Sequence, residues 1–135
     1  MLKREKNNIL IMGAGAVGCA FGTQLVKDEN NTVFFIARGS HLEAIKRNGL
    51  SVQTRKTKFT LKIHASDNPD DFNSKPDLIL LTLKSFDTKI AIEQLKSVIF
   101  KNTQILSFWI RMGVGSLVMY LGENEEKIWV LRNVN

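Results

Sequence analysis

A short apolar run followed at once by spaced glycines constrains this chain more than any other stretch. The run Ile9–Met12 has no polar interruption and leads into Gly13, Gly15 and Gly18 in a G-x-G-x-x-G pattern, after which apolar residues recur at helical spacing. At the start of such a helix, unpaired N–H groups and the helix dipole favour a bound anion. The stretch therefore predicts a pyrophosphate site, in preference to an ordinary tight turn.

Each glycine of the pattern has its own expected task. Gly13 allows a sharp turn out of the strand, Gly15 lets a pyrophosphate approach the backbone, and Gly18 lets the helix pack closely on the strand. The predicted cofactor-binding residues of this stretch are Gly13, Ala14, Gly15, Ala16, Val17 and Gly18.

The rest of the chain alternates apolar runs with helical periods, which indicates an α/β fold. Further strands are expected at Thr32–Ala37, Asp77–Leu83, Gln104–Trp109 and Lys127–Leu131, and helices at 20–26, 40–48, 90–99 and 116–122. Alternating runs at Leu50–Gln53 and Phe59–His64 predict a small antiparallel insertion. The expected architecture is one Rossmann-like domain over residues 1–135, with a doubly wound, mostly parallel sheet.

A cation stands at the end of the second predicted strand, where NAD sites carry an Asp or Glu for the ribose hydroxyls. The guanidinium of Arg38 would pair well with a 2′-phosphate. We therefore prefer an NADP(H)-binding role for Arg38 to the alternative that it is an ordinary exposed loop arginine. Ser40 and Glu43 have capping-box spacing for the helix that follows. His41 is expected in its exposed first turn, as a surface residue or a neighbour of the adenine.

A second cation, Lys84, follows the third predicted strand. The carboxyl ends of the strands line the ligand crevice in such a sheet, so Lys84 is a candidate cleft residue facing the cofactor or an anionic substrate. No catalytic residue is assigned. Cys19 lies on the apolar face of the first helix and is interpreted as a small buried hydrophobe, not as a nucleophile.

Charge and composition narrow the expected partners. The net charge is +6, but the cations are scattered and the densest run, Arg55–Lys58, has no interleaved aromatics, which favours an anionic small ligand over nucleic acid. The acids of Asp67–Asp71 have no nearby His or Cys and indicate a turn, not a metal site. Met1–Asn8 lacks a signal-like apolar region, and Ile105–Leu121 is interrupted, so a cytoplasmic location without a membrane span is expected.

Five stretches follow one another at characteristic spacing: Met12–Gly18, Ala37–Gly39, Asn48–Leu50, Leu83–Ser85 and Gly113–Gly115. Together they resemble the N-terminal NADP-binding domain of the ketopantoate reductase (2-dehydropantoate 2-reductase) family, over nearly the whole chain. The resemblance implies NADPH-dependent reduction of ketopantoate to pantoate on the route to pantothenate and coenzyme A. It also implies that the three glycines hold the pyrophosphate, Arg38 the 2′-phosphate, and Lys84 the cofactor side of the cleft.

Two departures from the family pattern bear on activity. Met112 stands where the family usually carries an Asn that contacts cofactor and substrate, and the family's helical C-terminal domain, with its Lys general acid and substrate-binding Glu, is expected to be absent after Asn135. The resemblance thus implies a chain that binds NADP(H) but does not turn over a 2-keto acid alone. A sheet flank left exposed would favour a homo-oligomer.

Two alternatives remain open at this point. The chain could be a stand-alone NADP(H)-binding module that senses or scaffolds without catalysis. It could also belong to another dehydrogenase type, acting on 3-hydroxyacyl-CoA or sugar nucleotides, which would prefer NADH regardless of Arg38.

Overall fold

The computed structural model describes residues 6–53, 55–82, 88–111, 114–121 and 125–132. The elements are β1 (Asn7–Met12), α1 (Ala16–Val26), β2 (Asn31–Ile36), α2 (Gly39–Asn48), β3 (Leu50–Gln53), β4 (Lys58–Leu61), β5 (His64–Ser66), the 3-10 helix η1 (Pro69–Asp71), β6 (Leu78–Leu81), α3 (Thr88–Leu95), the 3-10 helix η3 (Lys96–Val98), β7 (Gln104–Arg111), β8 (Val114–Leu121) and β9 (Glu125–Arg132). None of the helices in the described ranges is long and apolar enough to span a membrane.

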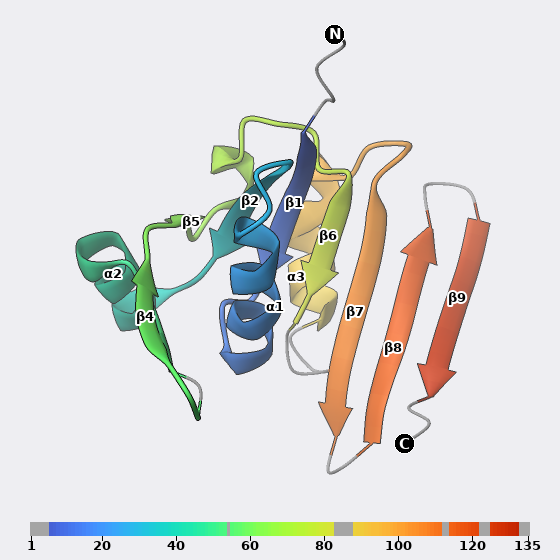
Figure 1. Cartoon of the computed structure of the whole chain (residues 1–135). Coiled ribbons are helices and arrows are strands. Elements are labelled where there is room, and N and C mark those ends of the chain that lie inside the picture. The colour runs from blue at the N-terminus through green and yellow to red at the C-terminus, as the bar shows by residue number, and fades with distance from the viewer. Residues whose placement is uncertain (1–5, 54, 83–87, 112–113, 122–124, 133–135) are drawn as a thin grey trace, which may run out of the picture.

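One large sheet organises the molecule, with the strand order β5-β2-β1-β6-β7-β8-β9 (Figure 1). The first five strands are parallel to one another. Beyond them, β8 pairs antiparallel with β7, and β9 pairs antiparallel with β8. The chain builds outward from β1 through β2 to β5, then returns to the other side of β1 for β6 and β7. With the separate β3–β4 pair, this confirms the predicted Rossmann-like, mostly parallel fold with a small antiparallel insertion.

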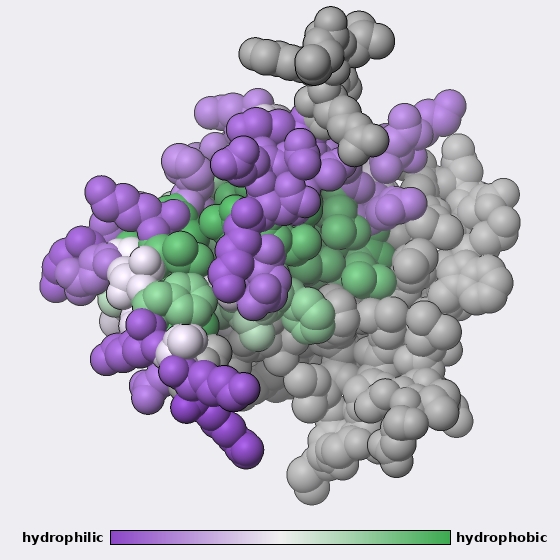
Figure 2. Space-filling model, viewed as in Figure 1, coloured by the Kyte–Doolittle hydropathy of each residue, from purple (hydrophilic) through white to green (hydrophobic). Residues whose placement is uncertain are grey.

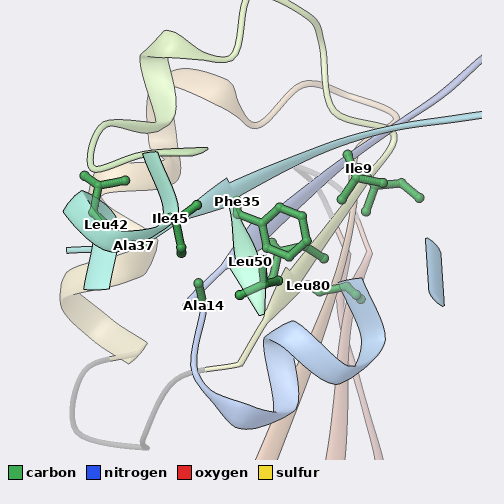
Figure 3. Packing of buried hydrophobic residues seen from close by; sticks show 10 residues of the cluster. Ile9, Ala14, Phe35, Ala37, Leu42, Ile45, Leu50 and Leu80 are labelled. Atoms are coloured by element: carbon green, nitrogen blue, oxygen red, sulfur yellow. The ribbon is translucent and has the colours of Figure 1, made fainter. Parts of the chain in front are cut away.

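The central strand β1 is buried on both faces, as its unbroken apolar run predicts. Ile9 and Ile11 pack into a cluster shared with α1 and α2, part of which is drawn in Figure 3. Leu10 and Met12 point to the opposite face and pack with residues of α3. In Figure 1, α1 lies in front of the sheet and α3 behind it. On the face shown in Figure 2, hydrophobic groups gather in the middle of the described part and hydrophilic groups at its margins.

The register of the three central strands places their carboxyl ends at one level. Met12, the last residue of β1, pairs with Ile36 on one side and with Leu81 on the other. Each of these residues is also the last of its strand. The loops that follow β1, β2 and β6 therefore leave the sheet side by side, which is where ligands bind in doubly wound folds.

The second strand of the predicted insertion is shorter than expected, and an additional strand follows it. The alternation over Phe59–His64 predicts one strand, but β4 ends at Leu61 and His64 begins β5, whose residues pair in parallel with Phe34–Ile36 of β2. The prediction was wrong because the outer backbone groups of β2 need partners, and Ile63 packs against the α1 and α2 side of the core. His64 is exposed, as expected.

The predicted helix at 116–122 is also wrong, because residues 116–121 belong to β8 (Val114–Leu121). It pairs with β7 over eight residue pairs, from Gln104–Leu121 to Arg111–Val114, so that β7 runs beyond the expected end at Trp109. Only residues 112 and 113 separate the two strands, a connection short enough for an antiparallel return. The ladder gives partners to the outer backbone groups of β7, and the β-branched and aromatic residues of the segment suit a strand.

The sequence signals for helix α2 fail at its N-terminus and hold at its C-terminus. Its N-cap is Arg38, without a side-chain hydrogen bond, so Ser40 lies inside the helix and the capping box with Glu43 is not formed. Its C-terminal signal is confirmed: Gly49 adopts a φ of 81° and donates its N–H to Ile45 O at 2.8 Å.

Candidate nucleotide-binding site

The glycine turn leaves the carboxyl end of β1 and is fixed first by β2. Gly13 has a φ of 106°, in the left-handed region that favours glycine, which confirms its expected turning role. The N–H groups of Gly13 and Ala14 both donate to Ile36 O, at 3.3 and 3.1 Å. The last carbonyl of β2 therefore holds the turn against the end of the neighbouring strand.

The strand on the other side, β6, fixes the same turn through Thr82. Thr82 donates its backbone N–H to Met12 O at 3.0 Å and its hydroxyl to Gly13 O at 2.6 Å. The sequence reasoning missed Thr82. The one sequence feature that could have indicated it is a hydroxyl side chain inside the third apolar run, at the position that directly follows β6.

Gly18 lies where α1 touches this turn. A Cβ on Gly18 would lie 2.0 Å from Gly13 O and 2.6 Å from the Thr82 hydroxyl, distances that real Cβ atoms do not show. The close helix packing predicted for Gly18 is therefore confirmed, and the contact is to the backbone of the turn itself.

Gly15 differs from Gly18 because it faces open space. It is the N-cap of α1, exposed and extended at φ −79° and ψ −167°. Apart from Gly15 and its chain neighbours, a Cβ there would have no heavy atom within 4 Å. The first N–H groups of α1, beginning at Ala16, have no partner within the helix. The turn thus combines free backbone donors with room beside them, the combination that an anion requires.

A pocket of about 280 Å³ opens beside the turn, a small volume for a ligand site and enough for part of a dinucleotide. It is lined by Met12, Gly13, Ala14, Gly15, Ile36, Ala37, Arg38 and His41. The structure therefore brings Arg38 together with the glycine turn at one opening, as the sequence predicts. Lys84, Met112 and Gly113 lie outside the described residues.

Arg38 is exposed at the mouth of this pocket, at the start of α2. One of its terminal nitrogens donates to Gln94 Oε1 on α3 at 3.3 Å, a contact between two segments that no sequence pattern relates. Within the described ranges, no carboxylate forms an ion pair with Arg38. Its remaining N–H groups are available to an anionic ligand, since a guanidinium carries five.

The carbonyl of Ala14, in the middle of the turn, is the acceptor for two side chains. Nε2 of His41 lies 2.6 Å from Ala14 O, and the Cys19 thiol donates to the same oxygen at 3.2 Å. Partial burial raises the pKa of the Cys19 thiol through desolvation. This supports the interpretation of Cys19 as a packing residue, because the thiolate is the nucleophilic form.

The raised pKa predicts slow reaction of Cys19 with a thiol reagent. At about pH 7.5 the folded chain should hold less Cys19 thiolate than the unfolded chain. A disulfide reagent should therefore label the folded chain more slowly than the chain unfolded in roughly 8 M urea. As the pH is raised, the labelling rate of the folded chain should begin to increase at a higher pH than that of the unfolded chain. Equal rates in both states across the pH range would contradict the assignment.

The acidic segment before β6 is held by local hydrogen bonds. Asn68 Oδ1 accepts from the N–H of Asp70 at 3.0 Å, and a carboxylate oxygen of Asp71 accepts from the Ser66 hydroxyl. These contacts fit the expected turn and cap residues. In the described part of the chain, no three His, Cys, Asp or Glu residues are arranged to hold a metal ion.

Comparison with known proteins gives one consistent result. The sequence model of the family described as "Ketopantoate reductase PanE/ApbA" matches residues 9–109. The chain is 37% identical over 123 residues to the 2-dehydropantoate 2-reductase of Pyrococcus horikoshii, covering 91% of this chain and 36% of that protein. It is 34% identical over 98 residues to the enzyme of the same name from Streptococcus pyogenes, covering 73% and 31%.

Solved structures show the same likeness. A PanE/ApbA family ketopantoate reductase from Ralstonia eutropha superposes with a TM-score of 0.69 at 36% identity, over 76% of this chain and 34% of that one. D-mandelate dehydrogenase, solved with NADH and anilino(oxo)acetate, gives a TM-score of 0.70 at 28% identity, over 78% and 34%. The chain thus spans about a third of the length of the relatives it matches.

Proposed function

The chain belongs to the ketopantoate reductase PanE/ApbA family, and from this we propose that it forms the NADP(H)-binding domain of a 2-dehydropantoate 2-reductase. The observation that carries the proposal is the pocket where the glycine turn and Arg38 share one opening. Because the chain spans about a third of its relatives' length, we assign it the cofactor-binding part of the reaction and expect no turnover by these 135 residues alone.

The geometry suits a dinucleotide in a definite direction. The pyrophosphate would lie at the open side of Gly15, against the free N–H groups of α1, and the adenosine ribose would lie toward the end of β2, where Arg38 would pair with a 2′-phosphate. The proposed cofactor-binding residues are Gly13, Ala14, Gly15, Ala16, Val17, Gly18, Arg38 and Lys84. Lys84 enters as a cleft residue by its place in the sequence after β6.

The names of the relatives support a nicotinamide cofactor and a small 2-keto acid as substrate. When bound, the reduced nicotinamide would supply a hydride to the ketone carbon, and the developing alkoxide then needs a proton donor. The described pocket residues bind and orient the nucleotide. We assign no proton donor among them.

The experiment that tests the proposal is a titration of the purified chain with NADPH and with NADH. We expect NADPH to bind more tightly, because Arg38 lines the pocket at the proposed ribose end and has no carboxylate partner among the described residues. Arg38→Ala should weaken NADPH binding by roughly 10- to 100-fold, the effect of a lost charge-assisted contact of about 1.5 to 3 kcal/mol, and should leave NADH almost unchanged.

The control for Arg38→Ala is Arg47→Ala, which changes the net charge equally. Arg47 lines a separate pocket at the other end of α2, so its removal should leave both affinities unchanged. Failure to bind either nucleotide would refute the cofactor-domain proposal. A preference for NADH that Arg38→Ala does not alter would indicate a NAD-dependent relative, as the NADH-bound mandelate dehydrogenase illustrates. Turnover of ketopantoate by this chain would overturn the expectation that it only binds.

A further inference from the structure

The Ala14 carbonyl accepts hydrogen bonds from side chains of two helices, α2 and α1. His41, three residues beyond Arg38 on α2, places Nε2 2.6 Å from this oxygen, while the Cys19 thiol on α1 lies at 3.2 Å. A carbonyl oxygen can only accept, so Nε2 of His41 carries the hydrogen. A thiol is a weak donor, which leaves His41 as the stronger of the two contacts.

The direction of this carbonyl sets the direction of the next N–H group. The peptide bond between Ala14 and Gly15 is planar and trans, so the Gly15 N–H points opposite to the Ala14 carbonyl. Among the described residues, none accepts a hydrogen bond from the Gly15 N–H. This donor therefore points away from the Ala14 carbonyl and from His41. The Cβ position of the same residue, Gly15, faces open space.

We propose that His41 is a positioning residue for the dinucleotide turn. By holding the Ala14 carbonyl, it presents the Gly15 N–H to the pyrophosphate before the nucleotide arrives, so binding needs no rotation of that peptide. Pre-organisation of this kind raises affinity because the ordering cost is met on folding. The inference rests on the proposed function, since it assigns His41 to the same nucleotide site.

This role differs from a direct contact with the ligand in one measurable way. The pyrophosphate is common to NADPH and NADH, whereas the 2′-phosphate occurs only in NADPH. A residue that positions the turn must therefore affect both nucleotides by the same factor. A residue that touches the 2′-phosphate must affect NADPH alone.

The test compares His41→Ala, His41→Gln and the unchanged chain in titrations with NADPH and NADH. His41→Ala should raise both dissociation constants by a common factor of roughly 10, the effect of losing one hydrogen bond to a partly buried group, and so leave their ratio unchanged. The side-chain amide of glutamine reaches about as far as Nε2 and can donate to the carbonyl, so His41→Gln should restore most of the affinity. Thermal denaturation of each variant reports whether it is folded.

His64→Ala is the matched control. It removes the other histidine of the chain, which is exposed on β5 and lines a different pocket, and it should change neither affinity. Loss confined to NADPH, no loss at all, or equal losses for the alanine and glutamine variants would each overturn the positioning role. If the unchanged chain binds neither nucleotide, the proposed function fails instead, and the two failures are thus distinguishable.

Discussion

Replacing Gly18 by alanine is expected to disrupt the fold at the point where α1 meets the turn. The new Cβ would lie 2.0 Å from Gly13 O, a backbone atom that also accepts the Thr82 hydroxyl, so no side-chain rotation relieves the overlap. Overpacking usually costs about 1 to 3 kcal/mol, and we expect at least the upper value here because backbone must move. Urea denaturation of Gly18→Ala against the unchanged chain measures the difference in unfolding free energy.

The strain should also appear in function. A folded fraction of Gly18→Ala has a displaced turn, so its nucleotide affinity should fall together with its stability. Full stability in the urea experiment would contradict the packing described for α1. For the stability measurement, the matched control is the same substitution at Gly15, three positions earlier, where a methyl group meets no heavy atom within 4 Å beyond Gly15 and its chain neighbours.

Gly15→Ala is expected to give the opposite separation of effects. Its φ of −79° suits alanine, so the unfolding free energy should change by less than about 1 kcal/mol. The methyl group would instead occupy the open side where the pyrophosphate is proposed to lie. If the methyl group prevents two hydrogen bonds from backbone N–H groups to the pyrophosphate, the affinities for NADPH and NADH should both fall by roughly 100-fold, or about 2.7 kcal/mol.

A titration of Gly15→Ala with both nucleotides, alongside its urea curve, checks this expectation. A stable variant with unchanged affinities would place the pyrophosphate elsewhere. The comparison with Arg38→Ala is informative because that variant should weaken NADPH alone. Two substitutions at one pocket would then separate the part of the site common to both nucleotides from the part that recognises the extra phosphate.

The β1, turn and α1 segment could be predicted from sequence because its determinants are local. The structure of this segment is specified by neighbouring residues: a four-residue apolar run, a glycine that must adopt positive φ, and a helix that follows at once. These local signals all agree on one strand–turn–helix unit. Gly49 at the end of α2 is a similar case, since a left-handed C-terminal residue is a local requirement.

The parts that could not be predicted depend on partners far away in the chain. Whether His64 continues a hairpin or begins β5 is decided by the unpaired edge of β2, and the alternating pattern is compatible with both. Likewise, β8 forms a strand where the sequence predicts a helix because it pairs with β7. In the site, Thr82 and His41 act on carbonyls 69 and 27 positions away, and no spacing rule relates them to the glycines.

The hydrogen bonds to the turn also determine when a binding site can exist during folding. Ile36, His41 and Thr82 reach the turn only after β2, α2 and β6 have assembled around β1. An isolated strand and helix would lack these contacts, so nucleotide affinity is a property of the paired sheet and not of the glycine motif. By mass action, a nucleotide present at 100 times its dissociation constant would stabilise the whole assembled unit by about 2.7 kcal/mol. The cofactor thereby selects the completed sheet from the ensemble of partly folded chains.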